Sequence, residues 1–219
     1  MKISKQALAK YLDHTLLKPN ATKEEILTIC KEALDYQTAS VCVNAHWIKL
    51  VTSQLRDSMV VPCVVVGFPL GATSTATKVI ETRIAIDDGA KEVDMVINIG
   101  ELIGGNETFV KEDIKLVAEE THKKDNLLKV IIETSYLTND QIVTACQLAE
   151  DADADYVKTS TGFSSAGAKI DDVTLMRKTV GNRLGVKASG GIHNYNEAVA
   201  MIEAGASRLG VSATKQILA

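Results

Sequence analysis

The sequence predicts an α/β fold, a (β/α)8 barrel whose parallel strands alternate with helices. Eight short apolar runs recur along the 219 residues at an average spacing of about 28 residues, the size of one βα unit. Several of them are continuous runs of Val, Ile and Leu, as expected of parallel strands that are buried on both faces. An open, doubly wound sheet is less favoured, because no GxGxxG motif follows the first strand.

Local signals place the elements along the chain. Strands are expected at 14–17, 39–43, 60–66, 92–97, 128–133, 156–159, 184–188 and 208–211. Helices are expected at 4–12, 22–36, 45–57, 74–88, 107–124, 138–150, 170–180 and 195–204, with a last turn at 214–219. Thr22 and Glu25 form a capping box, whereas Gly89, Gly181 and Gly205 are suited to end helices. No linker interrupts this pattern, so a single domain over 1–219 is expected.

Composition excludes several classes of protein. The net charge of −4 and a pI near 5.6 argue against a nucleic-acid-binding protein. No apolar run approaches the ~20 residues that cross a bilayer, and no signal-peptide core opens the chain, so we expect a cytoplasmic protein with no membrane partner. The four Cys and four His show no metal-ligand spacing, and no metal site is expected.

Four of the apolar strands contain an ionisable residue. These are Asp94, Lys129, Lys158 and Lys187, and the three lysines are 29 residues apart. Equivalent positions on consecutive strands would bring the lysines together near the carboxyl-terminal mouth of the barrel. Desolvation and like charges both lower the pKa of a lysine, and a neutral amine attacks carbonyl groups to form a Schiff base. The alternative interpretation is purely structural: the lysines point outward or form a buried ion pair with Asp94 and Glu133.

Glycine and hydroxyl residues follow the last three expected strands. The turns read Thr-Ser-Thr-Gly-Phe at 159–163, Ala-Ser-Gly-Gly-Ile at 188–192 and Gly-Val-Ser at 210–212. The loops after strands 7 and 8 of such barrels often bind a phosphate group through backbone N–H groups. Ordinary turn chemistry is the alternative.

Six motifs together resemble the deoxyribose-phosphate aldolase family. They are DHTLLKP at 13–19, EVDMVINIG at 92–100, LKVIIET at 128–134, YVKTSTGF at 156–163, VKASGGI at 186–192 and RLGVS at 208–212. The resemblance implies a TIM barrel that reversibly cleaves 2-deoxy-D-ribose 5-phosphate to D-glyceraldehyde 3-phosphate and acetaldehyde in deoxynucleoside catabolism. It also implies a homodimer, a phosphorylated sugar and an aldehyde as ligands, and no metal or organic cofactor.

The resemblance also assigns roles to residues. Lys158 is expected to form the Schiff base, Lys187 to lower its pKa and assist proton transfer, and Asp94 to complete the proton relay. Residues expected to line the substrate site are Asp13, Lys129, Cys42 and Thr159. Residues expected to hold the phosphate are Gly162, Gly190, Gly191, Gly210 and Ser212.

Three positions depart from the pattern of some family members. Phe163 and His193 stand where those members have basic residues, and Ala213 replaces a second serine. Some members also have a longer tail with a tyrosine that reaches the site, and we expect no counterpart of that tyrosine here. Two rival functions remain: another imine-forming barrel of the transaldolase type, and a non-catalytic phosphate-binding barrel.

Overall fold

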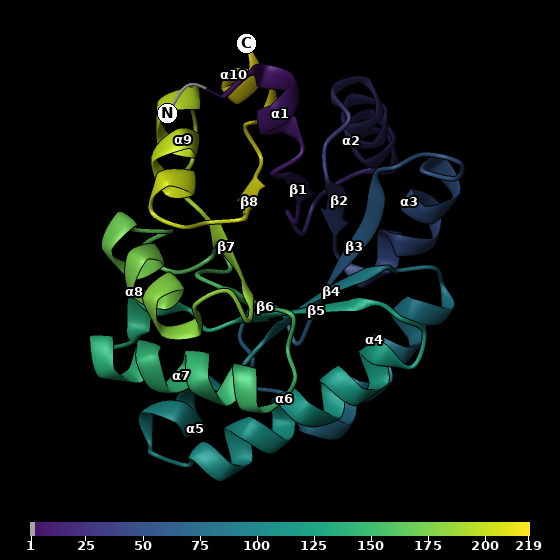
Figure 1. The fold of residues 1–219 in the computed structure, drawn as a ribbon. Coiled ribbons are helices and arrows are strands. Elements are labelled where there is room, and N and C mark those ends of the chain that lie inside the picture. Colours follow the sequence, from purple (N-terminus) through teal and green to yellow (C-terminus); the bar gives the residue numbers. More distant parts are fainter. Residues whose placement is uncertain (1–2) are drawn as a thin grey trace.

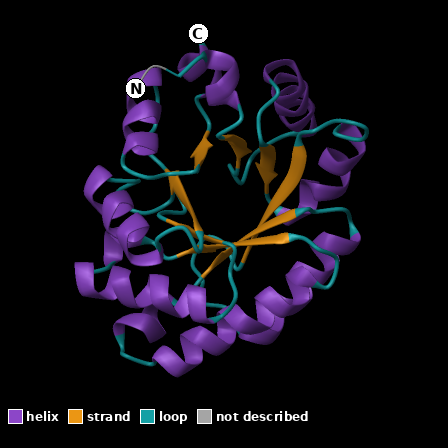
Figure 2. Ribbon diagram, in the orientation of Figure 1, coloured by secondary structure: helices purple, strands orange, loops and turns teal. Residues whose placement is uncertain are grey.

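The computed structural model describes residues 3–219 and shows a closed parallel barrel with the strand order β1 to β8 (Figures 1 and 2). The strands are β1 (Leu12–Leu16), β2 (Ser40–Val43), β3 (Val61–Val66), β4 (Glu92–Val96), β5 (Leu127–Ile131), β6 (Tyr156–Lys158), β7 (Gly185–Ser189) and β8 (Arg208–Val211). Each strand pairs in parallel with the next, and β8 closes the barrel onto β1. The predicted (β/α)8 fold is therefore confirmed.

Helices surround the strands on the outside of the barrel (Figure 2). They are α1 (Lys5–Ala9), α2 (Lys23–Tyr36), α3 (Ile48–Gln54), α4 (Thr75–Asp87), α5 (Ile99–Ile103), α6 (Glu107–His122), α7 (Asn139–Asp151), α8 (Ile170–Val180), α9 (Tyr195–Glu203) and α10 (Thr214–Leu218). Helices α1 and α10 pack together, so the two ends of the fold lie side by side (Figure 1). None of the helices in residues 3–219 has the length and apolar character needed to cross a bilayer.

The capping signals act as predicted. The Thr22 hydroxyl accepts a hydrogen bond from the backbone N–H of Glu25, and the Glu25 carboxylate accepts one from the N–H of Thr22. Thr138 is the N-cap of α7 in a second capping box with Gln141, and Asn194 caps α9. Such caps satisfy N–H groups that have no partner within the helix, each contributing about 1 kcal/mol.

The differences from the expected elements include two shifted boundaries and one additional helix. The helix expected at 45–57 is a 3-10 turn at Ala45–Trp47 followed by α3, which ends at Gln54. The short helix α5 after β4 was not predicted. Strand β5 ends at Ile131 rather than at 133, because Glu133 adopts a left-handed backbone conformation with φ of 55°. A residue with this conformation cannot continue a strand.

Strand register places two of the three strand lysines side by side. Lys158 is the register partner of Lys187, but Lys129 pairs with Tyr156, two residues before Lys158. The expectation of three equivalent positions is therefore wrong for Lys129, which lies one layer deeper. Neighbouring strands of a closed barrel are staggered along the barrel axis. Residues that are equally spaced in the sequence therefore do not lie at equal heights in the barrel.

The apolar core lies between the strands and the helices. Val41, Val64 and Val130 are fully buried in it, together with inward-facing side chains of the helices such as Ile26 and Ile114. Burial of each such side chain stabilises the fold by about 1.5–3 kcal/mol. The barrel interior is different, because its centre is filled by charged side chains.

Candidate active site

A pocket of about 320 Å³ opens at the carboxyl-terminal ends of the strands. Segments that follow β1, β6, β7 and β8 form its wall, which is where barrels of this type commonly bind ligands. The lining residues are Thr15, Leu16, Leu17, Lys18, Lys158, Thr161, Gly162, Phe163, Ser189, Gly190, Gly191, Ile192, His193, Gly210, Val211 and Ser212. Of the three strand lysines, Lys158 is on this wall, and Lys129 and Lys187 are not.

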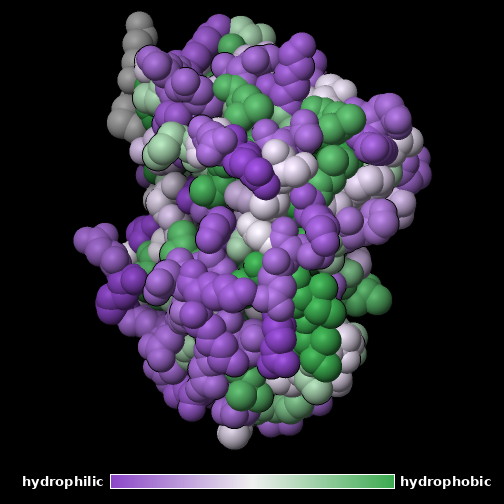
Figure 3. All heavy atoms as spheres, turned by 90° about the vertical axis from the view of Figure 1, so that its right-hand side faces the viewer, coloured by the Kyte–Doolittle hydropathy of each residue, from purple (hydrophilic) through white to green (hydrophobic). Residues whose placement is uncertain are grey.

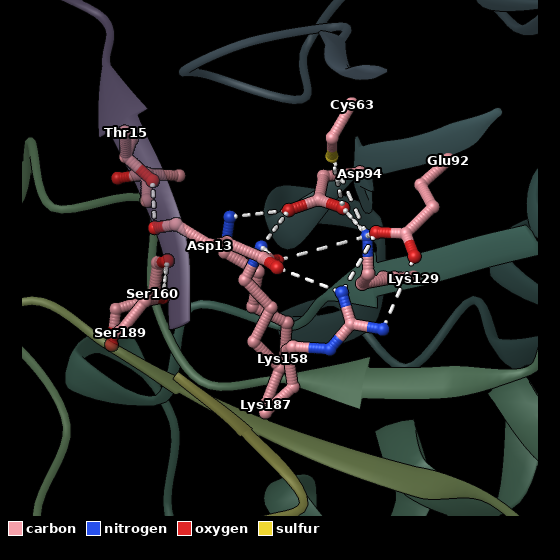
Figure 4. Close-up of polar contacts among 12 residues, drawn as sticks. Asp13, Thr15, Cys63, Glu92, Asp94, Lys129, Lys158, Ser160, Lys187 and Ser189 are labelled. Carbon is pink, nitrogen blue, oxygen red and sulfur yellow. Dashed lines mark hydrogen bonds and ion pairs between the residues drawn. The ribbon is translucent and has the colours of Figure 1, made fainter. Parts of the chain in front are cut away.

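Asp94 lies beneath the pocket and joins all three strand lysines. Its Oδ2 accepts hydrogen bonds from Lys158 Nζ at 2.8 Å and from Lys187 Nζ at 2.6 Å. Its Oδ1 accepts from Lys129 Nζ at 2.8 Å. Figure 4 shows the carboxylate between Lys158 and Lys187 on one side and Lys129 on the other. Two lysine nitrogens on one oxygen form the geometry in which a proton passes from one group to another over a short distance.

A second layer of charges lies deeper in the barrel. Lys129 Nζ is 2.6 Å from Glu92 Oε2, and Lys187 is paired with Asp13 as well as Asp94. The Arg208 guanidinium reaches Asp13 Oδ1 at 2.7 Å and both carboxylate oxygens of Glu92 at 3.0 and 3.1 Å. These side chains are nearly or completely buried, and most of their polar atoms have charged partners. Such pairing is what makes buried charges tolerable.

The surrounding charges fix the ionisation of the two main acids. Burial by itself raises the pKa of Asp94, but Lys129, Lys158 and Lys187 outweigh it and hold that pKa well below its usual value. The pKa of Asp13 is likewise lowered, since Lys187, Arg208 and Lys129 overcome the effect of burial. Both carboxylates are therefore ionised at neutral pH.

The neighbouring bases are held in their charged forms. Burial lowers the pKa of Lys187, but the carboxylates of Asp13 and Asp94 reverse the effect and raise it above the usual value. The pKa of Lys129 is raised in the same way, with Asp94 as the largest opposing cause. Lys187 and Lys129 are consequently ammonium ions at working pH.

The structure places all five predicted phosphate residues on the pocket wall. Gly190 and Gly191 have φ of 82° and 76°, a conformation that favours glycine, and both line the pocket. Gly210 has a further role, because a Cβ there would lie 2.8 Å from the Cβ of Ser189 and 3.1 Å from Lys187 Cε. Glycine at this position makes room for the lysine.

The four residues expected to line the substrate site lie below the pocket instead. Asp13, Cys42, Lys129 and Thr159 have no exposed surface, and none forms part of the pocket wall. For Lys129 the reason is its deeper layer, and for Asp13 it is the engagement with Lys187 and Arg208. These side chains support the residues of the wall rather than forming it.

Three further residues of the site were not singled out from the sequence. Glu92 and Arg208 belong to the buried ionic cluster, and Lys18 lies on the pocket wall. Glu92 had a readable signal, because residues two apart on a strand share a face and Glu92 is two before Asp94. Glu133 was considered from the sequence as an ion-pair partner of the strand lysines, but its carboxylate binds Thr161 and Ser164 of the loop after β6 instead.

Glu133 holds the loop that follows β6. Its carboxylate accepts hydrogen bonds from the Thr161 N–H at 3.2 Å, from Thr161 Oγ1 at 2.5 Å and from Ser164 Oγ at 3.0 Å. Gly162 and Phe163 lie between these two anchors and form part of the pocket wall. The ring of Phe163 also contacts the ring of Phe68 edge to face, with 5.3 Å between centroids.

Two groups among the described residues have donor atoms close enough to bind a metal ion. They are Cys42, Cys63 and Asp94, and Asp13, Cys63 and Glu92. Every carboxylate in them is already bonded to a lysine or to Arg208. A divalent cation there would have to displace an ammonium or guanidinium group from its carboxylate, so the donor set is poorly suited to a metal.

Comparisons with known proteins agree with this geometry. The model of the DeoC/LacD family of aldolases matches residues 7–219. A deoxyribose-phosphate aldolase of Clostridium botulinum is 58% identical over 96% of this chain and 99% of its own length. One of Streptococcus suis is 56% identical over 96% and 95%. The solved structure of a tetrameric deoxyribose phosphate aldolase from Aeropyrum pernix superposes with a TM-score of 0.92 at 29% identity, covering 98% of this chain and 91% of that one.

Proposed function

Because the chain belongs to the DeoC/LacD family of aldolases, we propose that it reversibly cleaves 2-deoxy-D-ribose 5-phosphate to D-glyceraldehyde 3-phosphate and acetaldehyde. The single observation that carries this proposal is the oxygen shared by two lysines. Asp94 Oδ2 is bonded to both Lys158 and Lys187, and Lys158 is the one of the two that reaches the pocket wall.

Lys158 is the nucleophile in this scheme. Its unprotonated Nζ adds to the C1 aldehyde carbon of the open-chain sugar, and loss of water leaves a protonated imine. When the C3 hydroxyl loses its proton, the C2–C3 bond breaks and its electron pair passes to the imine, which becomes an enamine. Carbons 3 to 5 leave as glyceraldehyde 3-phosphate. Protonation at C2 and hydrolysis then release acetaldehyde and restore the amine.

Asp94 and Lys187 move the protons. The Lys187 ammonium is an acid whose charge is held in place by Asp13 and Asp94, and it shares Asp94 Oδ2 with the reacting amine. A proton can therefore pass between the two nitrogens through one oxygen. Positioned acid–base groups of this kind typically accelerate a reaction by about 10²–10⁴-fold.

The glycine-rich end of the pocket receives the phosphate group. The backbone N–H groups near Gly190 and Gly191 supply donors, and Ser212 lies on the same wall. Lys18, on the segment after β1, adds a cation at the pocket. Phe163 and His193, which replace basic residues found in some relatives, leave Lys18 as a source of positive charge for the phosphate dianion.

We also propose that the protein acts in the cytoplasm as a homodimer, with residues 1–219 forming one catalytic domain. All four cysteines are unpaired, which is typical of a reducing compartment. Ile80 and Ile84, one turn apart on α4, are 53% and 58% exposed. Figure 3 shows the side of the molecule that carries α3 and α4, where hydrophobic residues gather in patches on an otherwise hydrophilic surface. Exposed apolar patches of this kind often mark contacts between subunits.

The direct test is cleavage of 2-deoxy-D-ribose 5-phosphate, in a coupled assay that isomerises the released glyceraldehyde 3-phosphate to the ketose phosphate and reduces it with NADH. Turnover is expected for the unmodified protein, none for Lys158→Met, and normal turnover for Lys111→Met, which removes an exposed lysine of α6. Cleavage of ketose donors in preference to deoxyribose 5-phosphate would favour a transaldolase-type enzyme. A protein without turnover on either substrate class would be a binding barrel.

A further inference from the structure

Every strand of the barrel contributes an ionisable side chain to its interior. They are Asp13 from β1, Cys42 from β2, Cys63 from β3, Glu92 and Asp94 from β4, Lys129 from β5, Lys158 from β6, Lys187 from β7 and Arg208 from β8. Three carboxylates thus face four basic groups among the described residues. With all of them ionised, the cluster has one positive charge in excess. A buried excess charge is unfavourable, so one basic group releases its proton.

The contacts identify the group that does so. Arg208 is bonded to Asp13 and to both oxygens of Glu92, and a guanidinium is not deprotonated in proteins. Lys129 has two close carboxylates, Glu92 and Asp94, and Lys187 has two, Asp13 and Asp94. Lys158 has one, and it shares that oxygen with Lys187. Lys158 is the basic group that loses least when it becomes a neutral amine.

We propose that Arg208 is a positioning residue for catalysis: its permanent charge puts the buried cluster one positive charge in excess and thereby keeps the Lys158 amine unprotonated. This inference rests on the proposed function, because it concerns the nucleophile of that reaction. Arg208 itself is not on the pocket wall, and it acts through Asp13 and Glu92, the carboxylates it occupies. Lys187 and Lys129 bind the same two carboxylates, so Arg208 partly neutralises the negative charge that would otherwise stabilise these two ammonium groups.

Most of the other charged and titratable groups near the cluster leave this balance unchanged. The Glu133 carboxylate is turned toward Thr161 and Ser164 of the loop after β6. Lys78 and Asp113 are buried outside the barrel and neutralise each other. Burial and the neighbouring Asp94 raise the pKa of the Cys63 thiol well above its usual value. The pKa of the Cys42 thiol is lowered by a hydrogen bond with Cys63, so Cys42 is the group to consider if the balance fails.

Opposite substitutions test the proposal. Arg208→Gln makes three cations face three carboxylates, so Lys158 stays protonated to higher pH. Glu92→Gln makes four cations face two carboxylates and favours loss of a proton. The readout is imine formation between acetaldehyde and the enzyme, trapped with cyanoborohydride from pH 5 to about pH 10 and measured as the fraction of Lys158 modified. Acetaldehyde has no phosphate, so the phosphate end of the pocket does not influence this assay.

We expect the midpoint of trapping to move by about one pH unit toward alkaline pH in Arg208→Gln and in the opposite direction in Glu92→Gln. The double variant restores one excess charge, and its midpoint is expected to return toward that of the unmodified enzyme. Arg83→Gln removes an arginine paired with Glu120 on the outer helices and serves as the matched control with an unshifted midpoint. A purely structural role of Arg208 would lower activity at all pH values without opposite shifts or rescue.

The outcomes of this experiment distinguish a failure of this inference from a failure of the proposed function. If the unmodified enzyme forms no adduct at Lys158, the proposed function fails. If it forms that adduct but Arg208→Gln titrates like the unmodified enzyme, another group, such as a Cys42 thiolate, balances the charge and the role of Arg208 is refuted. If Arg208→Gln does not fold, judged by circular dichroism, the acid shift of Glu92→Gln decides: its absence refutes the proposal.

Discussion

Substitution of Glu133 by Gln should weaken phosphate binding without affecting the chemistry at Lys158. Glu133 is 2% exposed and has φ of 55°, a conformation that strains a residue other than glycine by about 1–3 kcal/mol. Its carboxylate binds Thr161 and Ser164, which lie on either side of Gly162 and Phe163. The loop that forms one wall of the pocket therefore depends on an acceptor outside it.

The size of the effect follows from the hydrogen bonds. The amide introduced by Glu133→Gln would keep one acceptor oxygen but replace the other with an NH2 group, which cannot accept from the Thr161 N–H or hydroxyl. Loss of one hydrogen bond to a charged acceptor corresponds to about 1.5–3 kcal/mol. If that free energy holds the loop in its binding position, the KM for deoxyribose 5-phosphate rises about 10–100-fold, since about 1.4 kcal/mol corresponds to tenfold.

Steady-state kinetics with two substrates measure this. The KM for deoxyribose 5-phosphate should rise, whereas the rate of imine trapping with acetaldehyde should stay within about twofold, because Lys158 and Asp94 are unchanged. Glu112→Gln, which removes an exposed carboxylate from α6, is the matched control. An equal loss on both substrates, or no change in KM, would refute the anchoring role of Glu133.

Three other predictions follow from the same geometry. Ser212→Asp places a carboxylate at the phosphate end, so the KM for deoxyribose 5-phosphate should rise strongly while addition between small unphosphorylated aldehydes is less affected; equal losses would place Ser212 elsewhere. The raised pKa of Lys187 means that this residue is charged throughout the working range, so Lys187→Leu should shift imine trapping to alkaline pH and lower turnover about 10²–10⁴-fold, measured as a pH profile, and an unshifted profile would contradict its electrostatic role. Activity should survive dialysis against strong chelators, because an imine supplies the electron sink, and loss of turnover that zinc restores would contradict the mechanism.

Much of the fold was readable from the sequence because each βα unit carries its own local signals. Helix α8 was predicted with both ends correct, and the capping box at Thr22 marks the start of α2. The elements that were predicted wrongly depend on single backbone conformations or short turns, as at Glu133 and in α5. Such features depend on contacts from other parts of the chain, which no local pattern contains.

The residues of the site could be predicted where their type is informative. The height of each side chain along the barrel axis was harder to predict. The three lysines and Asp94 stood out because a charged group in an apolar strand needs a partner of opposite charge. In the structure all three lysines bind the Asp94 carboxylate. The stagger of the strands places Lys129 below the pocket, and sequence spacing does not show that stagger. Arg208 lies at the first position of its strand, so the sequence alone gave no reason to place its side chain among the buried acids.

The identity of the lysine that forms the imine is the decisive observation for the proposed mechanism. The unmodified enzyme is incubated with acetaldehyde, reduced with borohydride, digested and analysed by mass spectrometry. We expect one ethyl adduct on Lys158, the lysine that joins the pocket to Asp94. An adduct on Lys187 or Lys129 instead would contradict the mechanism, since both are buried ammonium ions with two close carboxylates each.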